Sequence, residues 1–267
     1  MTSTALTIAG SDPSGGAGLQ ADLKTFHQHG VYGMSVVTLL TVQNTRAVSA
    51  VEMVRPDLVI AQLSAVLDDI PPRAAKTGAL GNAEIIEAVA GKLAGTSFPL
   101  VIDPVMISKH GAPLMAPEAV KALVSLLLPR AFLVTPNLAE AEHLADMRVA
   151  DTDSMEQAAR RIASMGPRHV LIKGGHLQGD SVDLLLAEGK VRLLPAPRVE
   201  TPHTHGTGCV LSAAITARLA RGEDVAKAVE GAKAFVHRAI GSNPGLGGGF
   251  GPINIFADPR LDSCHAG

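Results

Sequence analysis

The sequence predicts an α/β protein in which a mostly parallel central sheet is flanked by helices on both faces. Short runs rich in apolar and β-branched residues alternate with segments whose apolar residues recur at helical spacing. This alternation is typical of consecutive βα units, which build a parallel sheet covered by helices. A pair of expected strands late in the chain breaks the alternation, so we expect the sheet to be mixed near one edge.

Each element is predicted from its own run of residues. The strands are expected at Ala5–Ala9, Ser35–Val42, Ala74–Thr77, Leu100–Ile102, Phe132–Thr135 and Val170–Ile172. The helices are expected at Gly18–Gln28, Asp57–Asp69, Ala83–Ala94, Pro117–Leu127, Ser154–Met165, Gly208–Arg221 and Asp224–Ile240. Asp153, with Glu156 three residues later, has the spacing of a capping box and marks the start of the fifth helix. Gly189 separates the two strands that break the alternation, Asp180–Glu188 and Lys190–Val199.

Length and composition favour one globular domain over residues 1–267. A hydrophobic content of 46% is enough for one large core, and we find no internal repeat or linker-like segment. A net charge of −2, with one Tyr and no Trp, argues against a nucleic-acid partner. The two Cys residues cannot form a disulfide framework. No run is long enough to span a membrane and the N-terminus does not resemble a signal peptide, so we expect a cytoplasmic protein.

A glycine cluster, GSDPSGGAGLQAD at residues 10–22, connects the first expected strand to the first helix. Its residues 16–21, GAGLQA, match the dinucleotide-binding pattern G-x-G-x-x-G/A. An NAD-dependent dehydrogenase also needs an acidic residue at the end of the second strand, where this sequence has Gln43 and Asn44. The P-loop pattern fails as well, because glycine stands at position 16 where that pattern requires lysine. The cluster therefore favours a tight turn at which a small ligand contacts backbone.

A second glycine-rich connection, HGTGC at residues 205–209, leads directly into an expected helix. Backbone N–H groups near Gly206 and Gly208 and the positive end of the helix dipole would converge there, which suits a transferring phosphoryl group. The same field would lower the pKa of the Cys209 thiol, which could then serve as a base or a ligand contact. Two alternatives stay open: an ordinary helix start with a buried Cys209, and a weaker zinc site at His203, His205 and Cys209.

Seven motifs stand in the order found in one enzyme family. They are AGSDPSGGAGLQADLKTF, TVQNT, KTGAL, DPVMISKHGAPL, TPNLAEAE, VLIKGGH and HTHGTGC. Between about Leu6 and Pro252 the chain thus resembles the hydroxymethylpyrimidine/phosphomethylpyrimidine kinases of thiamine biosynthesis, which have a ribokinase-like fold. The resemblance implies a protein, usually a homodimer, that uses ATP and Mg²⁺. Such enzymes phosphorylate 4-amino-5-hydroxymethyl-2-methylpyrimidine, here called hydroxymethylpyrimidine, and then phosphorylate its monophosphate to the diphosphate.

The resemblance also assigns residues to the substrate pocket. It implies that the loop from Gly10 to Ala17 lines the pyrimidine pocket and that Gln43 hydrogen-bonds the aminopyrimidine. A carboxamide suits this task because it offers a donor and an acceptor side by side. Ala79 in KTGAL and Val105 in DPVM are implied as further substrate-binding residues.

A second group of residues is implied at the phosphates. Asn137 and Glu140 stand three apart at a strand-to-helix junction, so they can face one point; the resemblance makes them Mg²⁺ ligands. They also fit a helix N-cap with a capping-box acid, and we expect both. The resemblance implies that Asp103 lies beside the Mg²⁺ and that Lys173 neutralises phosphates. Lys109 belongs to the implied flap, where the sequence reads SKHGA instead of the family's AKSGD.

The implied mechanism is in-line transfer of the γ-phosphoryl group of ATP to the hydroxymethyl oxygen. The amides from Gly206 through Thr207 and Gly208 to Cys209 would share the developing charge with Lys173 and Mg²⁺. If Cys209 is a base, it matters more in the first step, because a phosphate monoester is already largely ionised. Three alternatives remain: a pyridoxal kinase with the same GTGC element, a catalytically silent pyrimidine sensor, and the dehydrogenase.

Overall fold

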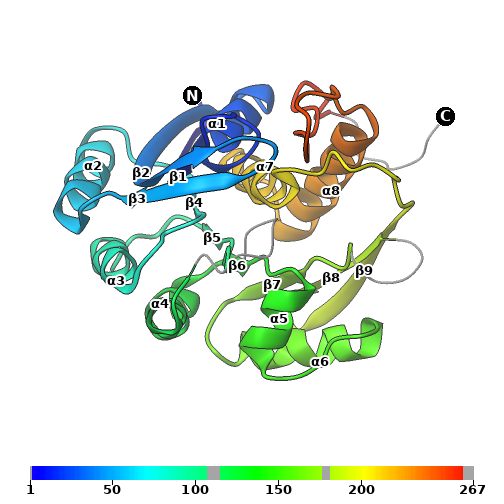
Figure 1. Cartoon of the computed structure of the whole chain (residues 1–267). Helices are drawn as coiled ribbons and strands as arrows, with labels where there is room; N and C mark the ends of the chain where they lie inside the picture. Colours follow the sequence, from blue (N-terminus) through cyan, green and yellow to red (C-terminus); the bar gives the residue numbers. More distant parts are fainter. Residues whose placement is uncertain (1, 107–114, 176–180, 261–267) are drawn as a thin grey trace.

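The computed structural model describes residues 2–106, 115–175 and 181–260, and the strands of this part form one nine-stranded sheet. The strands lie in the order β3-β2-β1-β4-β5-β6-β7-β8-β9 (Figure 1). Neighbours from β2 through to β7 pair in parallel, whereas β3, β8 and β9 pair antiparallel at the two edges. The prediction of a mostly parallel sheet that becomes mixed at an edge is confirmed.

The strand boundaries agree with the sequence except at one edge. The strands are β1 (Thr4–Ser11), β2 (Tyr32–Gln43), β3 (Val48–Met53), β4 (Ala74–Thr77), β5 (Leu100–Ile102), β6 (Leu133–Val134), β7 (His169–Ile172), β8 (Ser181–Ala187) and β9 (Lys190–Ala196). β3 was not predicted, and β2 begins earlier than expected. β3 pairs with the outer half of β2 and is mostly exposed, so its sequence lacks the buried apolar signal of the central strands.

The seven expected helices occur in the predicted order, and α5 (Leu138–Ala145) is an additional helix for which only the start at Asn137 and Glu140 was expected. The expected helices are α1 (Gly18–Gln28), α2 (Pro56–Asp69), α3 (Ala83–Lys92), α4 (Pro117–Ala122), α6 (Thr152–Ala163), α7 (Thr207–Ala220) and α8 (Val225–Gly241). α4 continues through a π-helical turn at Leu123–Leu127 and a short 3₁₀ turn at Leu128–Arg130. In the described part of the chain, no helix has the length and apolar character needed to cross a membrane.

The capping box predicted for α6 is wrong by two residues. The N-cap is Asp151, whose side chain accepts a hydrogen bond from the Ser154 N–H at 2.8 Å. The Ser154 hydroxyl oxygen in turn accepts a hydrogen bond from the Asp151 N–H at 3.0 Å. Asp153 lies inside the first turn, where a carboxylate stabilises the helix dipole without capping it.

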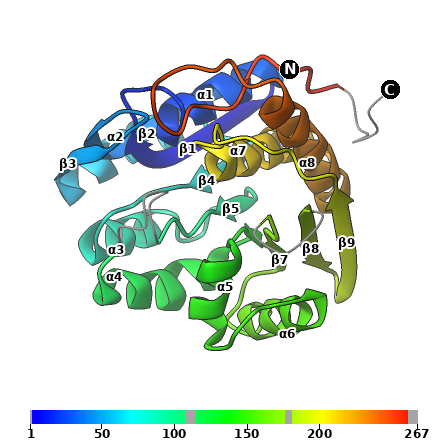
Figure 2. The ribbon, with the colours of Figure 1, turned by 45° about the vertical axis from the view of Figure 1, so that its right-hand side comes forward.

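Helices cover both faces of the sheet and create two separate cores. α1, α7 and α8 lie on one face, and α2 to α6 lie on the other (Figures 1 and 2). Successive strand residues point to opposite faces. In β5, for example, Leu100 and Ile102 join the core beneath α2 to α6, while Val101 joins the core beneath α7 and α8. Strands buried on both faces explain the continuous apolar runs of the sequence.

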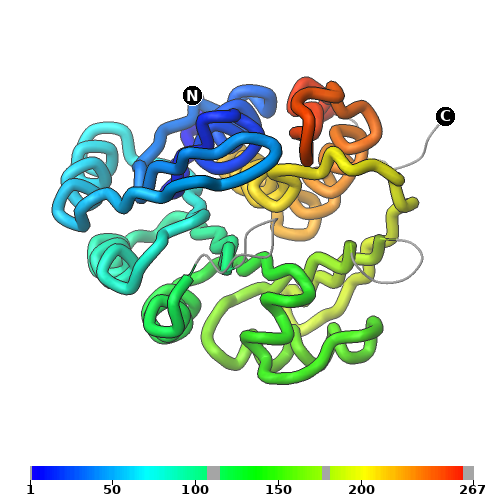
Figure 3. Tube along the Cα trace, viewed as in Figure 1, coloured from blue at the N-terminus to red at the C-terminus, as the bar shows by residue number. Residues whose placement is uncertain are grey.

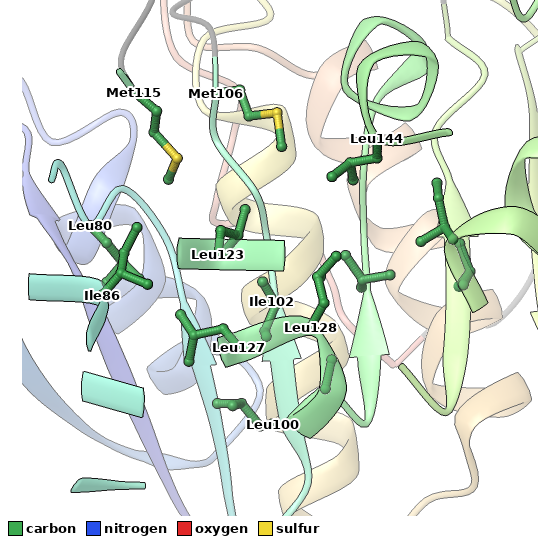
Figure 4. Packing of buried hydrophobic residues seen from close by; sticks show 14 of the residues in the cluster. Leu80, Ile86, Leu100, Ile102, Met106, Met115, Leu123, Leu127, Leu128 and Leu144 are labelled. Atoms are coloured by element: carbon green, nitrogen blue, oxygen red, sulfur yellow. The ribbon is translucent and has the colours of Figure 1, made fainter. Parts of the chain in front are cut away.

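The larger core supports the strand ends that carry the site. Figure 4 shows Leu100 and Ile102 of β5 packed among leucines from the turns after α4, with Met106 close to the end of the strand. Met106 is 5% exposed, so the chain remains anchored just beyond Asp103. This packing holds the carboxyl end of β5 rigid, which a precise arrangement of charged groups requires.

The loop after β1 lies where the sheet changes its direction of growth. β1 is flanked by β2 on one side and by β4 on the other, so the chain adds strands first to one side and then to the other. Ligands of open α/β sheets bind at such a switch point, beyond the carboxyl ends of the strands. In the fold, the loop after β1 lies next to the segment that precedes α7 (Figure 3).

Candidate active site

A cavity of about 1010 Å³ opens beyond the carboxyl ends of the parallel strands. It is lined by every predicted site residue that the structure describes: Gly10, Ala17, Gln43, Ala79, Asp103, Val105, Asn137, Glu140, Lys173, Gly206, Thr207, Gly208 and Cys209. Lys109 lies outside the described residues. The residues implied for the pyrimidine and those implied for the phosphates therefore share one cavity, although the individual roles stay predictions.

The two glycine-rich loops pack directly against each other. Gly206 has a φ of 77°, and a Cβ on it would collide with the carbonyl oxygen of Gly16. A Cβ on Gly16 would in turn lie 2.7 Å from Cδ2 of the His205 ring. Glycine is required at both positions, because a side chain on Gly206 would meet the Gly16 backbone and one on Gly16 would meet the side chains of His205 and Pro252. The loop after β1 and the loop before α7 therefore form one continuous wall of the cavity.

The loop after β1 is folded around its own carboxylate. Asp12 accepts hydrogen bonds from the Ser14 N–H at 2.9 Å, the Ser14 hydroxyl at 2.7 Å and the Ala17 N–H at 2.9 Å. The ring Nε2 of His205 lies 2.8 Å from the same carboxylate. Burial alone would raise the pKa of Asp12, but the hydrogen bonds from His205 and Ser14 outweigh burial and lower it. Because Asp12 already occupies these amides, the loop is a tight turn and not a phosphate cradle.

The phosphate side of the cavity combines a helix start with an ion pair. Lys173 Nζ lies 3.0 Å from Asp103 Oδ1. A Cβ on Gly208 would lie 3.3 Å from that Nζ, so the first turn of α7 borders the ammonium group. Burial disfavours the charged form of Lys173, but the carboxylates of Asp103 and Glu140 outweigh it and raise the pKa of Lys173. The ammonium group therefore stays charged where an anion would meet the helix N-terminus.

Asn137 and Glu140 form the capping box expected from the sequence. The Asn137 side chain accepts from the Glu140 N–H at 2.9 Å, and the Glu140 carboxylate accepts from the Asn137 N–H at 2.8 Å. The second carboxylate oxygen of Glu140 accepts from the Met106 N–H at 3.2 Å. Burial, together with the nearby charge of Asp103, raises the pKa of Glu140. The cap is confirmed, and the metal-binding role of both residues stays a prediction.

The expected activation of Cys209 is wrong. The residue lies in the first turn of α7, as predicted, but burial raises the pKa of its thiol to about 11. The ammonium of Lys76 and a backbone hydrogen bond from Gly18 favour the thiolate, whereas the negative charges of Asp22 and Asp103 oppose it, and burial is the largest single influence. The sequence argument relied on the helix dipole and did not include burial, which disfavours the charged thiolate. At neutral pH Cys209 is a thiol.

The substrate side contains one residue under backbone strain. Val105 has a φ of 44°, a left-handed conformation that β-branched residues rarely adopt. Such strain is typical of functional sites, where the surrounding structure enforces it. The position of Ala79 is fixed by its carbonyl, which accepts a hydrogen bond from the Thr38 hydroxyl at 2.6 Å. Gln43 lies at the end of β2, with its amide group 3.3 Å from the His205 ring.

Sequence reasoning missed a buried ion pair at the edge of the cavity. Lys76 Nζ lies 2.8 Å from Asp22, both side chains are fully buried, and the Thr7 hydroxyl donates to the same carboxylate at 2.6 Å. A signal was present. Lys76 stands in the apolar strand AAKT, and Asp22 shares the buried face of α1 with Leu19 and Phe26. Because a buried charge requires a partner, two such charges on adjacent elements predict a pair.

The zinc alternative finds no support. His203 Nδ1 accepts a hydrogen bond from the Gly251 N–H at 3.1 Å, and the His205 ring is engaged by Asp12. Across the residues that the structure describes, no group of three His, Cys, Asp or Glu side chains could hold a metal ion. The histidines on either side of Thr204 instead anchor the loop before α7.

A mostly parallel sheet whose strand ends carry a glycine-rich helix start, a lysine and carboxylates is typical of a ribokinase-like small-molecule kinase. Residues 12–254 match the family model of phosphomethylpyrimidine kinase. The chain belongs to this family, and it is a phosphotransferase.

Relatives and solved structures agree with this family. The hydroxymethylpyrimidine/phosphomethylpyrimidine kinases of Streptomyces coelicolor and Haemophilus influenzae are each 49% identical to the chain. The first alignment covers 93% of both chains, and the second covers 96% of this chain and 97% of the relative. A crystal structure of phosphomethylpyrimidine kinase from Clostridium difficile 630 is 44% identical, with a TM-score of 0.80 over 89% of this chain and 99% of that one. The ADP complex of Staphylococcus aureus pyridoxal kinase is 37% identical, with a TM-score of 0.91 over 98% and 96%.

Proposed function

We propose that this chain phosphorylates the hydroxymethyl oxygen of hydroxymethylpyrimidine with ATP, and then phosphorylates the monophosphate to the diphosphate, in thiamine biosynthesis. The observation that carries this proposal is that one cavity holds both Gln43 and the Gly206–Cys209 helix start. The names of the Streptomyces coelicolor and Haemophilus influenzae relatives include both phosphorylations. The ADP complex of the similar Staphylococcus aureus kinase supports an adenine nucleotide as the phosphoryl donor.

The chain's own residues orient the reaction and stabilise charge. Gln43 and the wall from Gly10 to Ala17 hold the flat heterocycle, with Ala79 and Val105 as further contacts. The amides at the start of α7, including that of Thr207, and the ammonium of Lys173 share the charge that develops on the transferring group. Lys109 is proposed as a further phosphate contact from the flap.

In this mechanism Cys209 is a pocket contact and not a base. A thiol whose pKa is about 11 is almost entirely protonated at neutral pH. Phosphoryl transfer passes through a loose transition state, so the protein contributes mainly by positioning and charge stabilisation. The second acceptor is a phosphate monoester with a second pKa of about 6, so it is already largely ionised near pH 7.

We also propose Mg²⁺ as the cofactor. Asp103, Asn137 and Glu140 line the cavity with carboxylate and amide oxygens, the hard ligands that Mg²⁺ prefers. Glu140 and Asn137 already accept backbone hydrogen bonds, which agrees with a site that contacts the ion largely through its waters. The bound ion would neutralise phosphate charge.

We further propose a cytoplasmic homodimer in which residues 1–267 form one kinase domain. A sheet whose strands run from Thr4 to Ala196 supports the single domain. At its β3 edge, Leu40 is 51% exposed and Val42 is 62% exposed. An exposed apolar surface beside an edge strand favours a second copy of the chain as its partner.

The test is ATP consumption with hydroxymethylpyrimidine, its monophosphate and pyridoxal as separate acceptors. We expect turnover of the first two at higher kcat/KM than pyridoxal. Pyridoxal is the second candidate because the Staphylococcus aureus pyridoxal kinase matches the fold over nearly the whole chain. Preferred turnover of pyridoxal would overturn the assignment, and ATP consumption with none of the three would revive the silent sensor. The family match removes the dehydrogenase.

A further inference from the structure

The ring of His205 contacts two polar groups, the carboxylate of Asp12 and the carboxamide of Gln43. Its Nε2 is 2.8 Å from Asp12 Oδ2 and 3.3 Å from the amide group of Gln43. His205 is buried and Gln43 is half-buried, and both residues line the cavity. A single ring nitrogen therefore faces both a carboxylate of the loop after β1 and a proposed substrate contact.

Whether this nitrogen carries a proton follows from its contact with the Asp12 carboxylate. A carboxylate only accepts hydrogen bonds, so His205 Nε2 carries a proton that it donates to Asp12. The structure has the Gln43 Nε2 facing His205, which would set two donors against each other. The oxygen and nitrogen of a carboxamide are assigned from the hydrogen-bond network. Turning the Gln43 amide by half a turn makes its oxygen a second acceptor, which shares the one Nε2–H with Asp12, and directs its NH₂ group away from the ring.

We propose that His205 is a positioning residue that fixes the Gln43 carboxamide with its oxygen toward the ring and its NH₂ toward the substrate. The site would then favour a ring that offers a hydrogen-bond acceptor to Gln43, as the ring nitrogen of an aminopyrimidine does. This inference rests on the proposed function in one respect, namely that Gln43 contacts the substrate ring.

The His205 ring and its backbone are held by contacts from several segments. Gly16 packs against one edge, where a Cβ would lie 2.7 Å from Cδ2 and 3.4 Å from Nε2. The backbone N–H of His205 donates to the Gly251 carbonyl at 3.0 Å, and the residue forms a bridge with Pro252. The Asp12 carboxylate is held by the amides of its own loop. Nε2 is therefore aimed before a substrate binds, which reduces the ordering cost of binding.

His205 also links the two halves of the site along the chain. It directly precedes Gly206, the N-cap of α7 and the first residue of the proposed anion-binding turn. A displacement of the His205 ring would disturb Gln43, whereas a displacement of its backbone would disturb the amides of that turn. A side-chain substitution at His205 should therefore affect the pyrimidine and leave ATP binding unchanged.

A double-mutant cycle with His205→Leu and Gln43→Ala tests this inference, with initial rates measured on the acceptor that the wild-type enzyme prefers. We expect His205→Leu to raise the KM for the acceptor about tenfold or more, because a misdirected hydrogen-bonding group is left unpaired. The KM for ATP should stay within about twofold. In the Gln43→Ala background, His205→Leu should raise the acceptor KM no further, since the two residues act as one unit. Additive effects, or a loss confined to kcat, would overturn the inference.

Two further variants separate positioning from folding. His203→Leu removes the hydrogen bond to Gly251 from the same segment without removing a side chain that lines the cavity, so it measures the effect of loosening the loop alone. Its acceptor KM should rise less than that of His205→Leu, and an equal rise would contradict the inference. In His205→Gln the carboxamide can donate to both Asp12 and Gln43, so we expect most of the acceptor affinity to return. A His205→Gln enzyme with a wild-type melting temperature and the KM of His205→Leu would contradict the inference. Wild-type turnover tests the proposed function separately, so the two failures are distinguishable.

Discussion

Among the lysine–aspartate pairs that line the cavity, Lys76–Asp22 and Lys173–Asp103 differ chiefly in their access to it. Lys76 lies 2.8 Å from Asp22 and Lys173 lies 3.0 Å from Asp103. Both side chains of the first pair are 0% exposed, whereas the Lys173 side chain keeps 17% of its surface exposed. The chemistry of the two pairs is the same, so only their depth in the fold distinguishes a structural pair from one that can meet a ligand.

The burial of each pair determines what its lysine contributes to the protein. Burial disfavours the ammonium of Lys76, but the carboxylate of Asp22 outweighs burial and raises the pKa of Lys76. Either partner alone would therefore be a buried charge that water cannot reach. Lys173 faces the cavity, where its ammonium can meet a phosphate, while its partner Asp103 is only 4% exposed. The first pair should govern stability and the second should govern catalysis.

The largest effect is expected at the fully buried pair. Lys76→Met should lower the free energy of unfolding by roughly 3–5 kcal/mol, because it leaves Asp22 buried and unpaired. Urea denaturation followed by circular dichroism measures this change. The double variant Lys76→Met/Asp22→Leu should recover most of the loss, because apolar residues of similar size can replace a buried pair. A single variant as stable as wild type would remove the distinction between the two pairs.

The second prediction concerns the pair that faces the cavity. Lys173→Met should lower kcat by roughly 10²- to 10³-fold, since one preorganised charge is lost from the transition state. Its free energy of unfolding should fall by less than that of Lys76→Met, because the Lys173 side chain is 17% exposed whereas Lys76 is fully buried. Steady-state kinetics and urea denaturation measure the two quantities. Lys190→Met, at an exposed strand start, is the matched control and should leave both unchanged. A Lys173 variant that loses stability but keeps kcat would reverse the assignment.

The smallest effect is expected at Cys209. The charges of Asp22, Asp103 and Lys76 all influence the pKa of its thiol. Cys209→Ser should slow both phosphorylations equally and by less than about tenfold, whereas loss of a general base would cost roughly 10²- to 10⁴-fold. Single-turnover rates for the two acceptors measure this. A selective loss of the first step would restore Cys209 as a base.

The pH dependence of alkylation tests the same thiol in the Cys264→Ser background. Only the thiolate reacts with iodoacetamide. Because the pKa of Cys209 is raised to about 11, the thiolate fraction should increase about tenfold per pH unit from pH 7 to 10. A rate that levels off near pH 8 would indicate an activated cysteine and contradict the structure.

The order of the elements was readable from the sequence because it depends on local patterns. Apolar runs such as Leu100–Ile102 and helix starts such as Asn137 with Glu140 carry their signal within a few residues. β3 and the Asp151 cap were missed, the first because it is exposed and the second because two acidic residues compete for one cap position. The Lys76–Asp22 pair was missed because its members lie 54 residues apart.

The sequence by itself determined the family, the strand-ending residues and the two glycine-rich loops, because these depend on residue identity and short-range spacing. Only the tertiary structure decided what each charged or reactive group experiences. Burial keeps the Cys209 thiol protonated, and Asp12 accepts hydrogen bonds from the amides of the loop after β1. The fold also brings His205 into contact with Gln43, which lies 162 residues away in the sequence. Desolvation and hydrogen-bond partners depend on neighbours that are distant in sequence, so local patterns could not predict them.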